Sequence, residues 1–216
     1  MTNQTDMAAY YAKRAETYEQ VYDRPERQAD LAVLRERLCE VLRDQRVLEI
    51  ACGTGYWTAQ FAESAQSVLA TDINAEMIDI AKAKGMPAEK VRFALADAFD
   101  LTLEGTYSAC FAGFWWSHVL RQEQEGFLLK LREKLGKDTW LVLIDNVYVE
   151  GSSTTIARTD LQGNTFQIRT LPNGERYEVL KNFPTDSALR KKMGAVVKEI
   201  RILRLEHYWM LTCRFK

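Results

Sequence analysis

Between residues 46 and 145 the chain alternates short apolar runs with amphipathic segments, and no other feature constrains its fold as strongly. The apolar runs end at acids or glycines, which is typical of short buried strands. Short strands that alternate with helices indicate βαβ units, in which helices cover both faces of a parallel sheet. The expected strands are 46–51, 67–72, 91–97, 107–113 and 139–145, and the expected helices are 57–64, 75–84 and 122–135.

The segment before this alternation is expected to be helical. Residues 7–21 are rich in Ala, Tyr, Glu and Lys and predict a short helix, which Pro25 separates from the next one because proline disfavours helix in the residue before it. In 26–43, leucines recur every three or four residues, the spacing of an amphipathic helix. These leucines are Leu31, Leu34, Leu38 and Leu42.

The segment after residue 145 follows a different pattern. Residues 164–171 and 176–180 predict two strands joined by a turn at Pro172-Asn173-Gly174, and residues 185–193 predict a helix. The final strands, 196–205 and 208–215, are separated only by Glu206-His207, a link short enough to require antiparallel pairing.

These elements predict an α/β fold with a doubly wound, mostly parallel seven-stranded sheet and an antiparallel last strand. A helical N-terminal cap and a β-hairpin insertion after the fifth strand complete it. We expect one domain over 1–216, with the cap in 1–44, a ligand-binding core in 45–145 and the insertion in 150–184, since no linker or internal repeat interrupts the chain.

The composition disfavours several classes of protein. The formal net charge of −1 gives no long-range attraction to nucleic acids or anionic lipids, and no apolar run approaches the length of a membrane span. The cysteines do not cluster with each other or with histidines, which disfavours a zinc site and indicates a reducing compartment. They are Cys39, Cys52, Cys110 and Cys213. We expect a cytoplasmic protein with a small-molecule partner, as a monomer or a homodimer.

Three acids stand at the ends of neighbouring predicted strands. Glu49 ends the first strand, just before Gly53 and Gly55, while Asp72 and Asp97 end the second and third. In a doubly wound sheet, ligands bind beyond the carboxyl ends of the strands, where glycine lets the backbone approach closely. Carboxylates there accept hydrogen bonds from ribose hydroxyls and an adenine amine, so the pattern predicts an adenosine site.

The stretch from Val47 to Gly55 resembles motif I of the class I S-adenosylmethionine (SAM)-dependent methyltransferases, with Ala51 in place of the usual first glycine. Asp72-Ile73 resembles motif II, and residues 96–99 resemble the motif that binds the adenine amine. Residues 107–119 occupy the place of motif IV. Ser108 stands instead of the usual Asp, and only the second of the two usual histidines is present, as His118. The resemblance covers about residues 10–145.

This resemblance implies SAM as cofactor and a set of cofactor-binding residues. They are Tyr11, Glu49, Ala51, Gly53, Gly55, Asp72, Ile73, Met77, Asp97, Ala98, Phe99 and Gly113. Three alternatives remain open from the residues. Asp72 and Asp97 could be helix caps, the chain could be an NAD(P)-dependent oxidoreductase, or it could bind SAM without turnover. Thr58 argues against the oxidoreductase, because the third glycine of a nicotinamide fingerprint would fall there.

The resemblance also implies where the methyl acceptor binds. His118 is the candidate general base for an acceptor hydroxyl or amine, although the matching histidine is often structural in the family. We expect the insertion to line the acceptor site, whose identity and N, O or S nucleophile stay open. The candidate acceptor residues are Tyr18, Trp115, Trp116, Asn146 and Tyr148.

Asp145-Asn146 resembles the pair that binds magnesium in cation-dependent O-methyltransferases. That site also needs an Asp after the fourth strand, where this chain has Phe111-Ala112-Gly113-Phe114. Two adjacent oxygen ligands seldom hold Mg²⁺ alone. We therefore expect no metal.

Overall fold

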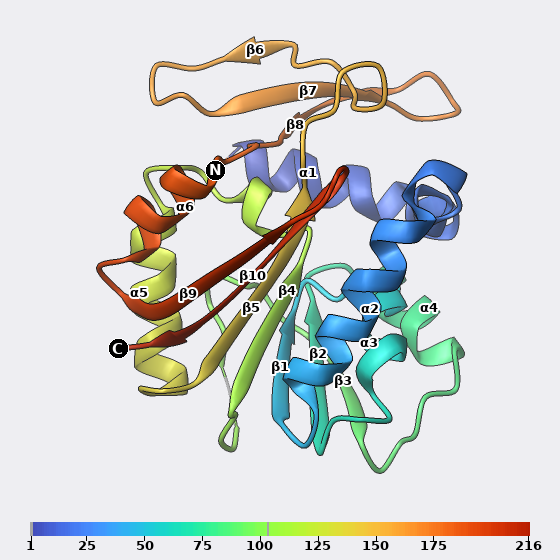
Figure 1. The fold of residues 1–216 in the computed structure, drawn as a ribbon. Coiled ribbons are helices and arrows are strands. Elements are labelled where there is room, and N and C mark those ends of the chain that lie inside the picture. The colour runs from blue at the N-terminus through green and yellow to red at the C-terminus, as the bar shows by residue number, and fades with distance from the viewer. Residues whose placement is uncertain (1, 103) are drawn as a thin grey trace.

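The computed structural model describes residues 2–102 and 104–216, with side chains from residue 7 onward (Figure 1). Within these ranges, seven strands form one sheet in the order β3-β2-β1-β4-β5-β10-β9. Strands β1 to β5 are parallel, and β10 is antiparallel to both β5 and β9. The predicted α/β fold, including its antiparallel last strand, is confirmed. The bounds are β1 (Arg46–Ile50), β2 (Ser67–Asp72), β3 (Val91–Leu95), β4 (Ala109–Gly113), β5 (Trp140–Asn146), β9 (Val197–Arg204) and β10 (Tyr208–Phe215).

The order of the sheet reverses beside β1. Strand β1 pairs with β2 on one side and with β4 on the other, so the chain winds outward in opposite directions from this point. The connections that follow β1 and β4 therefore lead away from each other, which leaves room for a ligand at the carboxyl ends of these two strands.

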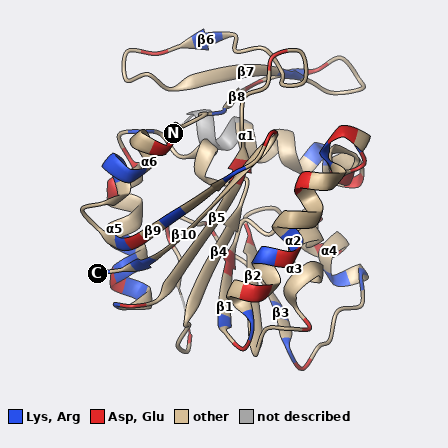
Figure 2. Ribbon diagram, viewed as in Figure 1, with Lys and Arg blue, Asp and Glu red and all other residues tan. Residues whose placement is uncertain are grey.

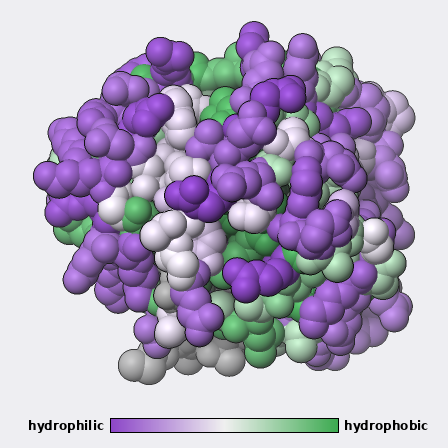
Figure 3. Space-filling view, turned by 90° about the horizontal axis from the view of Figure 1, so that it is seen from below, coloured by the Kyte–Doolittle hydropathy of each residue, from purple (hydrophilic) through white to green (hydrophobic). Residues whose placement is uncertain are grey.

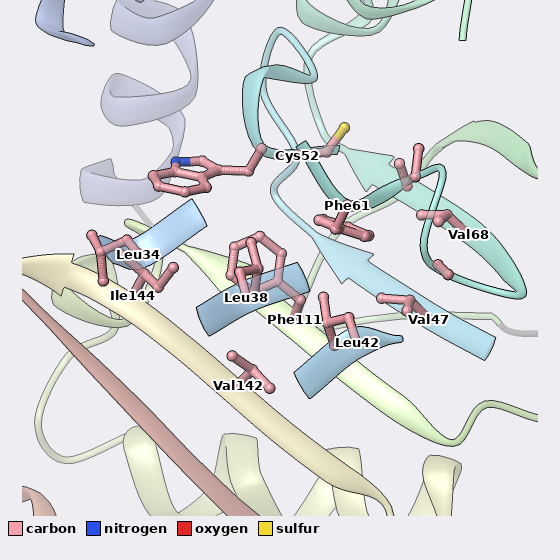
Figure 4. Close-up of a cluster of buried hydrophobic side chains, with 14 of the residues drawn as sticks. Leu34, Leu38, Leu42, Val47, Cys52, Phe61, Val68, Phe111, Val142 and Ile144 are labelled. Carbon is pink, nitrogen blue, oxygen red and sulfur yellow. The ribbon is translucent and has the colours of Figure 1, made fainter. Parts of the chain in front are cut away.

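Helices cover both faces of the sheet, and strand parity assigns each side chain to one face. Val47 packs in the apolar cluster under α2 and α3, whereas Leu48 and Ile50 pack in the cluster under α5 and α6. The predicted leucine stripe of α2 is fully buried, and Figure 4 shows part of it against β4 and β5. The helices are α2 (Gln28–Leu42), α3 (Tyr56–Phe61), α4 (Ala75–Ala83), α5 (Gln124–Leu135) and α6 (Asp186–Met193).

The N-terminal segment differs from the single helix predicted over 7–21. Helix α1 (Thr2–Lys13) is followed by the 3₁₀ helices η1 (Ala15–Tyr22) and η2 (Pro25–Arg27). On η1, Tyr22 stacks on Tyr56 with ring centroids 3.7 Å apart. This contact joins η1 to α3, a distant part of the sequence. The periodicity of residues 7–21 therefore does not record it.

The insertion forms a second, three-stranded sheet of β6 (Arg158–Thr159), β7 (Thr165–Thr170) and β8 (Arg176–Leu180). The predicted hairpin is β7 with β8, whereas β6 is too short to show an alternating pattern. Figure 1 shows α1 between this sheet and the carboxyl ends of the central strands. Met7 and Tyr10 on α1 pack against Leu171 and Val179 of the insertion. Thus α1 and η1 lie over the end of the sheet, while α2 covers its face.

The outer surface carries mixed charge. Figure 2 shows acidic and basic residues interspersed over the helices. The face opposite the second sheet is mostly hydrophilic, with a smaller apolar area (Figure 3). In the described part of the chain, no helix combines the length and apolar character needed to cross a bilayer.

Candidate active site

A first cavity lies at the carboxyl ends of β1 to β4, where the strand order reverses, and α1 lies over it. The turn after β1, the end of β2, the loop after β3 and the end of β4 each contribute to its wall. Most predicted site residues therefore meet in one place. Those that line the cavity are Tyr11, Tyr18, Ala51, Gly53, Asp72, Ile73, Met77, Asp97, Ala98, Phe99, Gly113, Trp115 and His118.

The turn after β1 is built around a carboxylate. Gly53 adopts a φ of 56°, a conformation that favours glycine, and its backbone N–H donates to Asp72 Oδ2 at 2.8 Å. Asn74 N donates to the other carboxylate oxygen at 2.9 Å. Asp72 is thus fixed at the tip of β2, and each oxygen keeps acceptor capacity for a ligand. Burial raises the pKa of Asp72, and the backbone N–H groups oppose that shift.

The rim beyond β3 combines a carboxylate with apolar side chains. Asp97 is exposed, and its Oδ1 accepts a hydrogen bond from Phe99 N at 2.9 Å. Ile73 lines the same cavity and is 51% exposed. Together with Met77 and Phe99 it forms an apolar surface edged by a carboxylate, which suits a flat heterocycle with an amine.

Glu49 does not line the cavity, unlike the other two acids. It is 1% exposed, and its carboxyl group accepts a hydrogen bond from Thr58 Oγ1 on α3 at 2.6 Å. Burial raises the pKa of Glu49 to about 8. The physical reason is parity: residues 47 and 49 point to the face that α3 covers, so the side chain lies beneath the glycine turn. The structure thus corrects its expected position.

A Tyr11–His118 pair lies in the wall of the cavity. His118 Nδ1 is 2.5 Å from the carbonyl oxygen of Leu180, so it carries the proton and donates. The unprotonated Nε2 accepts from the hydroxyl of Tyr11 at 3.0 Å. Burial, with Lys181 nearby, lowers the pKa of His118 to about 3, so the imidazole is neutral. Burial also raises the pKa of Tyr11 above its usual range.

A second cavity adjoins the first through these residues. Tyr11, Tyr18, Phe114 and His118 line both cavities. The wall of the second comes from η1, the end of β5, including Asn146, and the insertion. It therefore provides space for another molecule beside whatever occupies the first.

Asp145 is engaged by protein groups. Its Oδ1 accepts from Lys181 Nζ at 2.9 Å and its Oδ2 from Ser117 N at 2.8 Å, all of them buried. The Lys181 ammonium thus balances the negative charge of Asp145, the charge that a metal ion would otherwise balance. Among the described side chains, from residue 7 onward without residue 103, no three or more His, Cys, Asp and Glu residues group in a metal-binding arrangement.

Known proteins share this architecture and parts of this sequence. Residues 47–138 match a family described as a methyltransferase domain. The structure of DhpI in complex with SAH (S-adenosylhomocysteine) superposes on this chain with a TM-score of 0.82 at 26% identity. The match covers 99% of this chain and 97% of DhpI. The chain thus has the fold of the class I SAM-dependent methyltransferases, and residues 47–138 resemble a methyltransferase domain. SAM is accordingly the cofactor of the fold, as predicted.

More distant methyltransferases match over part of the chain or in fold alone. Magnesium-protoporphyrin O-methyltransferase of Rhodobacter capsulatus is 40% identical over 75 residues, a match that covers 33% of each protein. The chain thus matches a third of the length of that curated relative. The 1,6-didemethyltoxoflavin-N1-methyltransferase of Burkholderia thailandensis has the same fold, with a TM-score of 0.63 at 17% identity over 99% of this chain and 88% of that one.

The residues that line the first cavity fit SAM. Only the Tyr18 ring, 3.8 Å away, would lie near a Cβ added at Gly53, so the bare backbone leaves space in the cavity wall. Asp72 offers acceptor capacity to ribose hydroxyls, and Asp97 edges an apolar surface suited to a purine. We therefore name this cavity, whose lining suits SAM, the cofactor cavity.

Some predicted site residues lie outside this cavity. Trp116 is 1% exposed in the core under α5, so the structure places it behind the wall that Trp115 forms. Gly55 (φ 74°) packs against α4, where an added Cβ would lie 2.9 Å from Ala81 Cβ. Tyr148 packs against Phe183, which lines the second cavity, with ring centroids 5.2 Å apart.

Sequence reasoning also missed residues of the site. Phe114 lines both cavities and has a φ of 59°, and its position directly after Gly113 was the available signal. Arg14, Arg27 and Arg169 line the second cavity, but Arg169 is far from the other two in sequence and the three belong to no local motif.

Proposed function

We propose that this chain is a SAM-dependent methyltransferase that transfers a methyl group to a nitrogen, oxygen or sulfur atom of a small molecule. The observation that carries the proposal is the pair of adjoining cavities that share Tyr11, Tyr18, Phe114 and His118. One cavity has the side chains that suit SAM, and the other leaves space for an acceptor. Reaction between two bound molecules requires this adjacency.

Bound SAM supplies an activated methyl group, whose carbon gains a bond from the acceptor lone pair while the carbon–sulfur electron pair returns to sulfur. The chain's contribution is positioning. Asp72 and Gly53 orient the ribose end of the cofactor cavity, and Phe114 separates the two molecules only partly, since it lines both spaces. The overlying α1 limits access of water to the shared wall.

The Tyr11–His118 pair indicates what kind of nucleophile suits the site. With a pKa of about 3, His118 is a weak base, and its Nε2 already accepts from Tyr11. An acceptor that is unprotonated before it binds therefore fits better than one that must lose a proton. Tyr11 and His118 hold each other in place and present a neutral polar wall at the junction.

The names of similar proteins support a small-molecule acceptor. Relatives are described as methyltransferases of magnesium-protoporphyrin and of 1,6-didemethyltoxoflavin, and DhpI is also described in a complex with SAM and HEP. The second cavity is a partly enclosed space whose wall includes residues of the insertion, which suits a small acceptor better than a polymer. The insertion, as the part outside the shared core, sets the choice of acceptor.

The first test is calorimetric titration with S-adenosylhomocysteine. We expect binding in the micromolar range and a loss of about a hundredfold or more in Asp72→Ala, because the cofactor hydroxyls lose their acceptor. Asp79→Ala, at an exposed position of α4, is the matched control and should bind normally. Absence of binding to the wild type would overturn the proposal.

The second test separates catalysis from its rivals. Purified protein is incubated with methyl-labelled SAM and fractionated small metabolites, and transfer of label to a product is expected. A parallel titration with NADH tests the oxidoreductase alternative. Binding of NADH, or SAM binding with no transfer to any fraction, would contradict the proposed activity.

A further inference from the structure

Basic side chains from distant parts of the chain converge on the second cavity. They are Arg14, Arg24, Arg27, Arg169 and Lys181. Among the described residues, no Asp or Glu lines this cavity. A partly enclosed space walled by one sign of charge has a positive potential, because its low-dielectric walls screen the charges less than bulk water does.

Two of these cations have carboxylate partners. Lys181 Nζ lies 2.9 Å from Asp145 Oδ1, and both side chains are buried. Arg24 is exposed and lies 3.9 Å from Glu26. Neither of the two is therefore the main source of uncompensated charge.

The other three cations are bound only to neutral groups. In the described ranges, Arg14, Arg27 and Arg169 have no carboxylate within 4.0 Å. Their hydrogen bonds run to Tyr10 Oη (3.1 Å), Ser152 Oγ (3.0 Å) and Gln167 Oε1 (2.6 Å), respectively. These neutral partners orient the guanidinium groups and leave their charge unbalanced.

Arg27 carries a further sign of an absent partner. Its Nε is buried and has no acceptor among the described residues. The guanidinium lies over the ring of Tyr208, 5.7 Å from the centroid, but a ring contact does not supply a hydrogen-bond acceptor in the plane of the guanidinium. A buried donor without a partner costs free energy, which a ligand acceptor would recover.

We propose that the second cavity binds an oxyanion, a carboxylate or phosphate-type group that the methyl acceptor carries, through Arg14, Arg27 and Arg169. Planar guanidinium groups donate paired hydrogen bonds to such oxygens, and their positive charge attracts an anion. The inference deepens the proposed function by naming the class of acceptor and rests on it for the link to methyl transfer.

The cations of the second cavity also act on His118, which lines both cavities. Lys181 and Arg169 both contribute to the low pKa of His118. A bound oxyanion opposes their effect and raises the pKa of His118. Occupation of the cavity by an anion therefore makes the histidine a better hydrogen-bond acceptor at the moment when the acceptor is in place.

The test uses the full chain saturated with S-adenosylhomocysteine and titrated by calorimetry at fixed ionic strength. Inorganic phosphate is the first probe, acetate the second, and glycerol the neutral control. Saturable binding of phosphate or acetate, but not of glycerol, is expected, and the tighter anion identifies the source of the oxyanion. Absence of saturable binding for both anions would overturn the inference.

Variants then locate the anion. Each single substitution, Arg14→Gln, Arg27→Gln or Arg169→Gln, should weaken binding of the preferred anion about tenfold. The double variant that combines Arg27→Gln and Arg169→Gln should weaken it about a hundredfold. Arg169→Lys, which keeps the charge, should recover part of the loss. Arg201→Gln, on the exposed side of β9, is the matched control and should bind normally.

Two readouts separate this inference from the proposed function. Melting temperature and S-adenosylhomocysteine affinity should stay near wild type in the arginine variants, which shows that they fold and keep the cofactor cavity. Anion binding unchanged in the double variant would refute the oxyanion site and leave the methyltransferase proposal intact. Failure of the wild type to bind S-adenosylhomocysteine would refute that proposal instead, and the anion titration would then be read on the free chain.

Discussion

Glu49 and Asp72 are carboxyl groups on adjacent strands, yet their surroundings give them different roles. Asp72 accepts two backbone N–H groups, which support its charged form. Glu49 has one hydroxyl donor in a fully buried position, so burial dominates and its pKa rises to about 8. Near pH 7 the first suits a ligand contact, and the second acts as a mostly neutral hydrogen-bonding group in the core.

The raised pKa of Glu49 predicts a pH-dependent stability. Between its ordinary pKa of 4.5 and the folded value of about 8, the folded chain holds a proton that the unfolded chain has lost. The stabilisation is thus fully present below pH 4.5 and disappears as the pH rises through 8. Wild type should lose a few kcal/mol of unfolding free energy over this window relative to Glu49→Gln, as measured by urea denaturation.

Glu36→Gln, at an exposed position of α2, serves as control and should keep the wild-type pH profile. If Glu49→Gln shows the same slope as wild type between pH 5 and 8, then Glu49 is ionised in the folded protein.

At the scale of elements, the glycine turn is held between η1 and α4. Glu19 on η1 accepts from Thr54 Oγ1 at 2.5 Å and from Lys84 Nζ at 2.7 Å. Gly55 lies where α4 packs most closely on the turn. These contacts connect the part of the chain that covers the cofactor cavity to the turn that forms its wall.

The packing at Gly55 predicts a difference between two glycine substitutions. Gly55 and Gly85 have similar positive φ values, 74° and 67°, but an added Cβ meets Ala81 at 2.9 Å in the first case and nothing within 4 Å in the second. Gly85→Ala should cost about 1 kcal/mol of stability from backbone strain. Gly55→Ala should cost 1–3 kcal/mol more from overpacking, to order of magnitude, as measured by chemical denaturation.

Ala81→Gly removes the atom with which the new Cβ collides, so it should restore part of the loss in Gly55→Ala. Equal costs for the two glycine variants would show that α4 moves freely away from the turn.

At the scale of the whole molecule, the two cavities lie between the central sheet and segments that cross its end. Helix α1 contributes Met7 and Tyr11 to the cofactor cavity and packs on the second sheet through Tyr10. The insertion contributes Arg169 and Lys181 to the second cavity. Binding in either cavity is therefore coupled to the docking of α1 and the insertion.

This arrangement predicts where a ligand slows amide exchange. Saturation with S-adenosylhomocysteine at a hundred times its Kd should stabilise the fold by about 2.7 kcal/mol. Exchange should slow most in α1 and η1, because they cover the cofactor cavity, as measured by hydrogen–deuterium exchange with mass spectrometry. Helix α5, which contributes no residue to the wall of either cavity, provides the internal reference.

Uniform protection of α1 and α5 would mean that the ligand acts only on global unfolding. Asp72→Ala should abolish the effect in both.

The sequence by itself determined the type and order of the central elements, because apolar periodicity reports which side chains must be buried. It also placed Asp72, Asp97 and Gly53 together, since the carboxyl ends of parallel strands meet at one edge. Tertiary structure alone decided how the remaining groups are used. Helix α3 covers the face to which Glu49 points, and the arginines of the second cavity converge from segments more than a hundred residues apart. Such convergence depends on how elements dock, which no local pattern records.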